Sequence, residues 1–182
     1  MRPTVSANFA RRLYRRHHGA DICPSYLSWR TVNAADGRPL AVLGYRAAAD
    51  GPLFLESYLA GPIETVAAER LGMDVGRGDI VEIGCLAALP SPALVRLWHG
   101  SATALGDRFS VAVATLTAPL RRGFARVGLP IVPIAPATRG QLAGKRENWG
   151  RYYDQDPVVC VGIIADGALA LSRYAARLDA HA

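Results

Sequence analysis

The chain has 182 residues, of which 51% are hydrophobic and 20% are charged, and this balance is typical of a folded domain with a core and not of a disordered segment. Its formal net charge is +6, and arginine supplies nearly all of the positive charge because Lys145 is the single lysine. A basic balance suits nucleic acid, an anionic membrane, a phosphorylated cofactor or an acidic protein, and charge alone does not choose among these partners.

The sequence shows no membrane-spanning, secretory or disulfide signal. No apolar run reaches the roughly 18–20 residues that a bilayer span needs, and the basic N-terminus has no apolar core segment of the secretory type. Three cysteines, Cys23, Cys85 and Cys160, without a CxxC pair predict neither a disulfide framework nor a zinc site. We expect a reducing, cytoplasmic setting, with no bound metal.

The first predicted element is a helix that begins with Ser6 as its N-cap, runs to about His18 and ends at Gly19. Its periodicity places Phe9, Ala10, Leu13, Tyr14 and His17 on one side. The other side carries four arginines, Arg11, Arg12, Arg15 and Arg16. This arginine face is usually solvated, and it is also a possible dock for an acidic partner or for anionic lipid.

The rest of the chain predicts alternating strands and helices. We expect strands at 39–48, 52–59, 79–88, 108–115, 130–135 and 157–164, and helices at 62–72, 91–105, 118–128 and from 165 to about 178. The prolines in "LPIVPIAP" limit the strand at 130–135 to a short or edge role. This order predicts an α/β (α+β) fold with a mixed sheet and helices on its faces, in a single domain over residues 1–182.

A carboxylate interrupts the apolar strand "DIVEIGCLAA". Strand alternation places Glu82, Gly84 and Leu86 on one face and Cys85 on the other. A buried Glu must be paired, protonated or close to water, so Glu82 is either a structural partner of an arginine such as Arg46 or a general base beside the space that Gly84 leaves.

The exit of this strand predicts a binding edge. Its small residues allow a ligand chain to lie against the backbone, and the N-terminus of the next helix suits an anion. This arrangement resembles the acyl-CoA-binding edge of the GNAT acyltransferases, although "AALPSPALV" lacks the glycines of their phosphate loop. The expected donor-binding residues are Cys85, Leu86, Ala87, Ala88 and, on the following strand, Thr115.

Three segments carry a family resemblance. "AVLGYRAAADGPLFLESYLAGPIETVAAERLG", "RGDIVEIGCLAAL" and "NWGRYYDQDPVVCVGII" occur in order over about residues 10 to 165, and they resemble the thermostable hemolysin family. Where that family usually has Asn after V-E-x-G, this sequence has Cys85. The family's organisation is similar to the GNAT fold and especially to the acyl-homoserine-lactone synthases.

The resemblance implies a GNAT-like, mostly antiparallel central sheet with helices on both faces. It implies that Arg46 and Glu82 belong to an acceptor site, and we expect Glu56 of the "LFLE" segment there too. The donor would be acyl-CoA or acyl carrier protein, used as a co-substrate and not as a permanent cofactor. The carrier protein, which is acidic, would dock on the arginine face.

The "WGRYY" segment contributes the remaining candidates. Tyr153 is a candidate general acid, and Trp149 and Tyr152 are candidate walls of an acceptor pocket. The alternative is an aromatic cluster that closes the core. Cys85 is a candidate nucleophile, but no His lies near it in the sequence, while Cys23 and Cys160 fit core positions.

Three functions follow from the sequence. The first is an N-acyltransferase that moves an acyl group from a thioester to an amine, possibly an amino acid. The second is a membrane-active protein that lyses cells directly, as the family's name suggests. The third, nucleic-acid binding, agrees with the charge alone, because no nucleic-acid motif accompanies the scattered arginines.

Overall fold

A computed structural model describes residues 4–142 and 148–179. Its centre is a six-stranded sheet in the order β1-β2-β3-β4-β6-β5. The β3–β4 pair is parallel and the other four pairs are antiparallel, so the expected mixed, mostly antiparallel sheet is confirmed. The strands are β1 (Ser28–Asn33), β2 (Pro39–Ala47), β3 (Ile80–Ala88), β4 (Val111–Leu116), β5 (Val132–Pro136) and β6 (Val158–Ile163).

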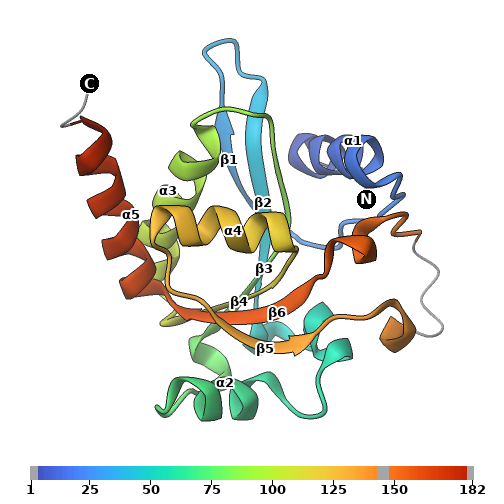
Figure 1. The fold of residues 1–182 in the computed structure, drawn as a ribbon, viewed down its shortest axis with the longest axis vertical. Helices are drawn as coiled ribbons and strands as arrows, with labels where there is room; N and C mark the ends of the chain where they lie inside the picture. Colours follow the sequence, from blue (N-terminus) through green and yellow to red (C-terminus); the bar gives the residue numbers. More distant parts are fainter. Residues whose placement is uncertain (1–3, 143–147, 180–182) are drawn as a thin grey trace.

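Helices cover both faces of this sheet. Ile80 of β3 packs in the cluster that includes α2, and the next residue, Val81, packs with α3 and α5, which places these helices on opposite faces. Figure 1 shows α3, α4 and α5 grouped together, apart from α1 and α2. The helices are α1 (Val5–His18), α2 (Ile63–Leu71), α3 (Ala93–Gly106), α4 (Ala118–Val127) and α5 (Ile164–Asp179).

Helix α1 begins two residues earlier than the sequence suggests. Thr4 and not Ser6 is the N-cap, because its Oγ1 accepts a hydrogen bond from Ala7 N at 3.1 Å. The Ser6 hydroxyl instead bonds Thr31 Oγ1 on β1 at 2.9 Å. The predicted end at Gly19 is confirmed, since this residue has φ 64° in the left-handed region that glycine favours.

The strand predicted at 52–59 is wrong. This segment forms a 3₁₀ helix, η2 (Phe54–Tyr58), because carboxylates and not a neighbouring strand take its first N–H groups. Leu53 N donates to Glu56, whereas Phe54 N and Leu55 N donate to Glu82. A strand that the sequence analysis missed, β1, pairs with β2 at one edge of the sheet, and its half-exposed burial pattern gives little alternation to detect.

The proline-containing strand lies at the other edge, as expected. β5 pairs with β6 alone in the strand order, and its register shifts between Pro133 and Ala135, where Pro133 has no N–H to donate. Within residues 4–142 and 148–179, no helix combines the length and the apolar character that crossing a membrane requires.

Candidate active site

Glu82 is a buried carboxylate held by backbone donors. It is 2% exposed, and its Oε1 accepts a hydrogen bond from Leu55 N at 2.9 Å while its Oε2 accepts one from Phe54 N at 3.3 Å. Burial raises the pKa of Glu82 above its ordinary value, against the opposing effects of the two N–H donors and of the Arg46 charge. A carboxyl group tuned upward in this way suits a general base.

Arg46 lies opposite Glu82 in the β2–β3 register, but its guanidinium is directed to other acceptors. It donates to Pro52 O at 3.0 Å and to Ser25 Oγ at 3.4 Å, and it lies 5.7 Å from the centre of the Tyr26 ring. Arg46 therefore acts on Glu82 through its charge, while the backbone of η2 supplies the hydrogen bonds.

The space above Gly84 is occupied by a side chain. A Cβ placed on Gly44 would lie 2.7 Å from the Tyr26 ring, and one on Gly84 would collide with the Tyr26 hydroxyl. That hydroxyl also hydrogen-bonds the Glu82 carboxylate and lowers its pKa. The two glycines on adjacent strands therefore leave the space that the Tyr26 side chain occupies, and Tyr26 covers one side of Glu82.

A small cavity of about 70 Å³ lies beside Glu82, and we call it the carboxylate cavity. Six of its fifteen lining residues are aromatic. The ring centres of Trp149 and Tyr152 lie 5.2 Å apart, and those of Phe54 and Trp149 lie 5.6 Å apart. Residues of the N-terminal segment that precedes β1 complete it. The lining includes Tyr14, Cys23, Tyr26, Phe54, Tyr58, Glu82, Cys85, Thr115, Trp149 and Tyr152.

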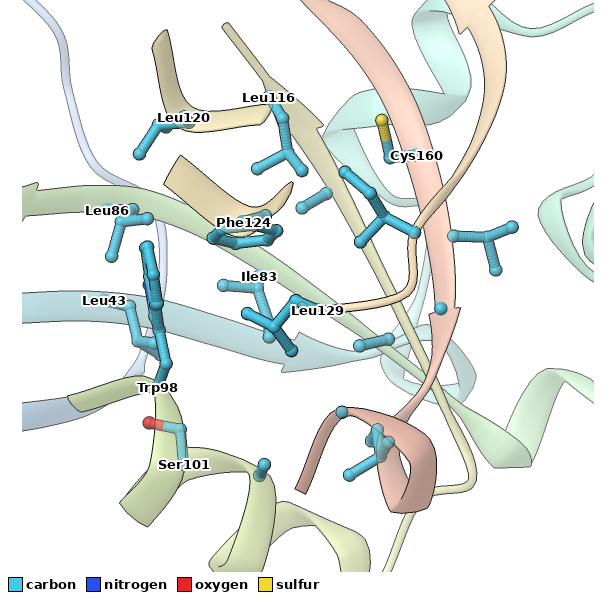
Figure 2. A pocket seen from close by; sticks show the side chains of 18 of the residues that line it. Leu43, Ile83, Leu86, Trp98, Ser101, Leu116, Leu120, Phe124, Leu129 and Cys160 are labelled. Atoms are coloured by element: carbon cyan, nitrogen blue, oxygen red, sulfur yellow. The ribbon is translucent and has the colours of Figure 1, made fainter. Parts of the chain in front are cut away.

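A second cavity, of about 130 Å³, lies between the sheet and the helices α3, α4 and α5, and we call it the apolar cavity. Figure 2 shows its side chains converging from the strands and from these helices. Among them are Leu43, Ile83, Leu86, Leu116, Phe124 and Leu129.

The two cavities share part of their walls, and we call this shared region the junction. It consists of Tyr14, Ile83, Gly84, Cys85 and Thr115, which line both cavities. The pairing of β3 with β4 extends no further than Ile83 and Ala114, so the junction lies where the two parallel strands separate.

A bulge in β3 shapes the junction. Val42 pairs with Ala87 and Gly44 with Gly84, so two residues of β3 lie opposite Leu43 alone, and the ladder is locally disrupted. Cys85 has φ 49°, a left-handed conformation that costs a non-glycine residue roughly 1–2 kcal/mol. The bulge shifts the alternation, so Cys85 lines the same cavity as Glu82 instead of pointing away from it.

The structure brings five of the eleven predicted site residues together in one cavity. Glu82, Cys85, Thr115, Trp149 and Tyr152 all line the carboxylate cavity, and Leu86 lines the apolar one. Ala87 packs in the α1 cluster and Ala88 in the α3 cluster.

Tyr153 and Glu56 line neither cavity. The Tyr153 hydroxyl shares a 2.7 Å hydrogen bond with the hydroxyl of Tyr58, which does line the cavity. Glu56 forms an ion pair with Arg77 at 2.7 Å and accepts hydrogen bonds from Leu53 N and Ile63 N. The ion pair is the main cause that lowers the pKa of Glu56 to about 2.

The arginine face of α1 is partly neutralised. Arg11 and Arg15 both contact Asp21 Oδ1, at 3.3 Å and 2.8 Å, and the guanidinium of Arg12 lies 5.8 Å from the centre of the Phe9 ring. Within the part of the chain that the structure describes, no three His, Cys, Asp or Glu side chains form a group that could hold a metal ion.

Four aromatic residues of the carboxylate cavity were not predicted from the sequence. Tyr14 was assigned to the apolar side of α1 without a role, and Phe54 and Tyr58 lay in the segment predicted as a strand. Tyr26 lies in a stretch for which no element was predicted. Its one sequence signal is the pair Gly44 and Gly84 on two strands, which leaves room for a ring.

Residues 2–168 match the thermostable hemolysin family. The chain belongs to this family. No curated protein matches the sequence significantly.

The fold is shared with several solved structures, among them an acyl-homoserine-lactone synthase and an N-acyl amino acid synthase. Apo TofI has a TM-score of 0.62 at 14% identity, with 94% of this chain and 91% of that chain covered. The AHL synthase LasI has a TM-score of 0.60 at 12% identity, covering 93% and 86% of the two chains. FeeM, an N-acyl amino acid synthase from uncultured soil microbes, has a TM-score of 0.58 at 17% identity, covering 88% and 90%.

Proposed function

We propose that this protein is an N-acyltransferase that moves an acyl group from a thioester, acyl-CoA or acyl carrier protein, to a small amine. The observation that carries the proposal is the junction, where an apolar cavity meets a cavity that contains a buried carboxylate. An acyl chain is apolar and suits the apolar cavity, and an amine is cationic and suits the carboxylate cavity.

The aromatic walls of the carboxylate cavity support an amine acceptor. A cation is attracted to the faces of aromatic rings and to a carboxylate, and this cavity combines Trp149, Tyr152 and Phe54 with Glu82. For an amino-acid acceptor, Arg46 is the guanidinium opposite Glu82, and it would hold the acceptor's carboxylate after releasing Pro52 O and Ser25 Oγ.

The proposed reaction is a single displacement at the thioester carbonyl. Glu82 takes a proton from the acceptor's ammonium group, the free amine attacks the carbonyl carbon, and the C–N bond forms as the C–S bond breaks. N–H groups of the bulge at Cys85 and Leu86 polarise the carbonyl oxygen. The leaving thiolate takes a proton from Tyr58, and Tyr153 replaces that proton through the shared hydrogen bond. The nitrogen loses its second proton as the amide forms, and this proton restores the tyrosine pair, so the proton on Glu82 is the one released to solvent.

The fold of the neighbours supports this class of reaction. FeeM is described as an N-acyl amino acid synthase, and BjaI was solved with SAM and isopentyl-CoA. In this chain the part of the donor that carries the thioester would lie along the end of β3, at Cys85, Leu86, Ala87 and Ala88. Thr115 would face it from β4. An acyl carrier protein would dock on the arginine face, chiefly on Arg12 and Arg16, because Asp21 engages the other two arginines.

Thermal shift tests the donor half of the proposal. We expect the melting temperature of the purified protein to rise with acyl-CoA or acyl carrier protein and to depend on chain length, because a ligand at about 100 times its Kd adds roughly 2.7 kcal/mol. CoA without an acyl group is the matched control. No shift with any donor, on a well-folded sample, would overturn the proposal.

The family's name points to a second activity, direct lysis of membranes. The purified protein, added without donor or acceptor to dye-loaded liposomes, separates the two functions. Release of dye would support direct lysis, and intact liposomes together with a donor-dependent thermal shift would support the acyltransferase.

A further inference from the structure

Two buried polar groups on α3 have no hydrogen-bond partner among residues 4–142 and 148–179. Trp98 Nε1 and Ser101 Oγ are both unpartnered within the structure, and their residues are 7% and 3% exposed. Both residues line the apolar cavity. A buried polar atom without a partner is costly, so an otherwise apolar wall that retains two of them calls for a ligand atom that completes them.

The two groups form one fixed feature of the wall. Residues three apart on a helix lie on the same face, and Trp98 and Ser101 share this face of α3 with Ala102 and Leu105, which also line the cavity. Figure 2 shows the Trp98 ring beside Leu43 and below Leu86, with Ser101 further down on the same helix. The indole is held in place by Phe124, whose ring lies edge-on at 4.5 Å.

The hydrogen-bonding capacity of Trp98 and Ser101 indicates which ligand group would pair with them. An indole N–H only donates a hydrogen bond, and a serine hydroxyl donates or accepts one. An oxo group would accept from both, and a hydroxyl group would accept from Trp98 and donate to Ser101. A plain hydrocarbon chain would leave both groups without a partner.

We propose that the acyl donor carries a hydroxyl or oxo group on the distal part of its chain, where Trp98 and Ser101 bind it. This inference rests on the proposed function. The thioester carbonyl lies at the junction, and neither Trp98 nor Ser101 belongs to the junction or lines the carboxylate cavity. The oxygen therefore lies beyond the carbons next to the carbonyl, where the chain reaches the α3 wall.

The test measures the binding of matched acyl-CoAs by calorimetry on the full chain. The probes are an unsubstituted saturated chain and chains of the same length with one hydroxyl near the carbonyl, in the middle or at the end. We expect one distal position to bind about tenfold more tightly than the unsubstituted chain, which corresponds to ~1.4 kcal/mol. Ser101→Ala and Trp98→Phe should each reduce this ratio at least threefold.

A matched control is Thr103→Val on the same helix, because this exposed hydroxyl bonds His99 O of its own helix and lines neither cavity. It should leave the ratio unchanged. Ser101→Ala should also keep or raise the melting temperature without ligand, since it removes an unpartnered buried hydroxyl.

Equal affinity for every probe, or a preference that both variants retain, would overturn the inference and leave the pair as one that water satisfies. Such a result would keep the proposed function, because the donors still bind. The absence of binding by any acyl-CoA and by the same chains on acyl carrier protein would overturn the proposed function and this inference with it.

Discussion

Replacing Glu56 with Gln tests whether this residue acts as a support for the site or as a binding group. Glu56 holds the start of η2 through Leu53 N and is paired with Arg77 at 2.7 Å. The Gln side chain keeps an oxygen for the backbone N–H but loses the charge. The turn that presents Leu55 N to Glu82 would then be held less firmly.

The magnitude follows from the pKa of Glu56. It falls from 4.5 to about 2 in the folded protein, and each pKa unit corresponds to about 1.36 kcal/mol, which gives an upper value of ~3.4 kcal/mol. Because the side chain is 19% exposed and Gln keeps one hydrogen bond, we expect a loss of about 2 kcal/mol at pH 7. For a chain of this size that lowers the Tm by roughly 4–8 °C.

The assay is urea unfolding of both proteins between pH 7 and pH 3. A lowered folded pKa stabilises the protein above pH 4.5 and loses this effect as the pH falls toward 2, so the difference between wild type and variant should narrow below pH 4.5. Asp36→Asn is the control, because Asp36 pairs with Arg38 at 2.6 Å on the exposed surface, where an ion pair contributes little to stability, so its cost should be clearly smaller than that of Glu56→Gln. Equal costs for the two variants, or a difference that does not change with pH, would refute the reasoning.

Three further outcomes are expected. Because burial raises the pKa of Glu82, the rate of acyl transfer should increase with pH through that raised value, while the free energy of unfolding falls over the same range. Glu82→Gln should abolish the pH dependence of the rate and lower the rate by roughly 10²–10⁴. A pH-independent rate in the wild type would contradict the role of Glu82 as base. Tyr26→Phe removes a hydrogen bond that favours the charged carboxylate, so the acidic limb of the kcat/KM profile should move to higher pH; a shift to lower pH would contradict the assignment. Gly84→Ala should displace Tyr26 and lower the free energy of unfolding by about 1–3 kcal/mol in denaturant unfolding. Gly61→Ala, which has no atom within 4 Å of its new Cβ, should leave the free energy of unfolding nearly unchanged. Equal costs would contradict the close packing of Tyr26 against Gly84.

The sequence predicted those parts of the fold that depend on local patterns. The apolar run around Glu82 and the alternation of strands and helices were sufficient for β3, its following helix and the mixed sheet. The prediction at 52–59 failed because its residue pattern resembles that of a strand. Its N–H groups donate to the carboxylates of Glu56 and Glu82, and the sequence pattern does not indicate these hydrogen bonds.

The candidate site was predicted by residue type better than by geometry. Glu82, Thr115, Trp149 and Tyr152 meet in one cavity, and no local pattern shows that the three segments that carry them converge there. Simple alternation placed Cys85 on the wrong face, because a single extra residue in β3 reverses the alternation beyond it.

The most direct measurement is amide formation in a single turnover. The protein is mixed with the acyl-CoA that gives the largest thermal shift and with a panel of the twenty amino acids and S-adenosylmethionine, and the products are detected by mass spectrometry. The account predicts an N-acyl product from the wild type, with Glu82→Gln slowed at least a hundredfold and Thr103→Val unaffected. An acyl donor that binds and yields no amide with any of these amines, or equal rates from wild type and Glu82→Gln, would contradict it.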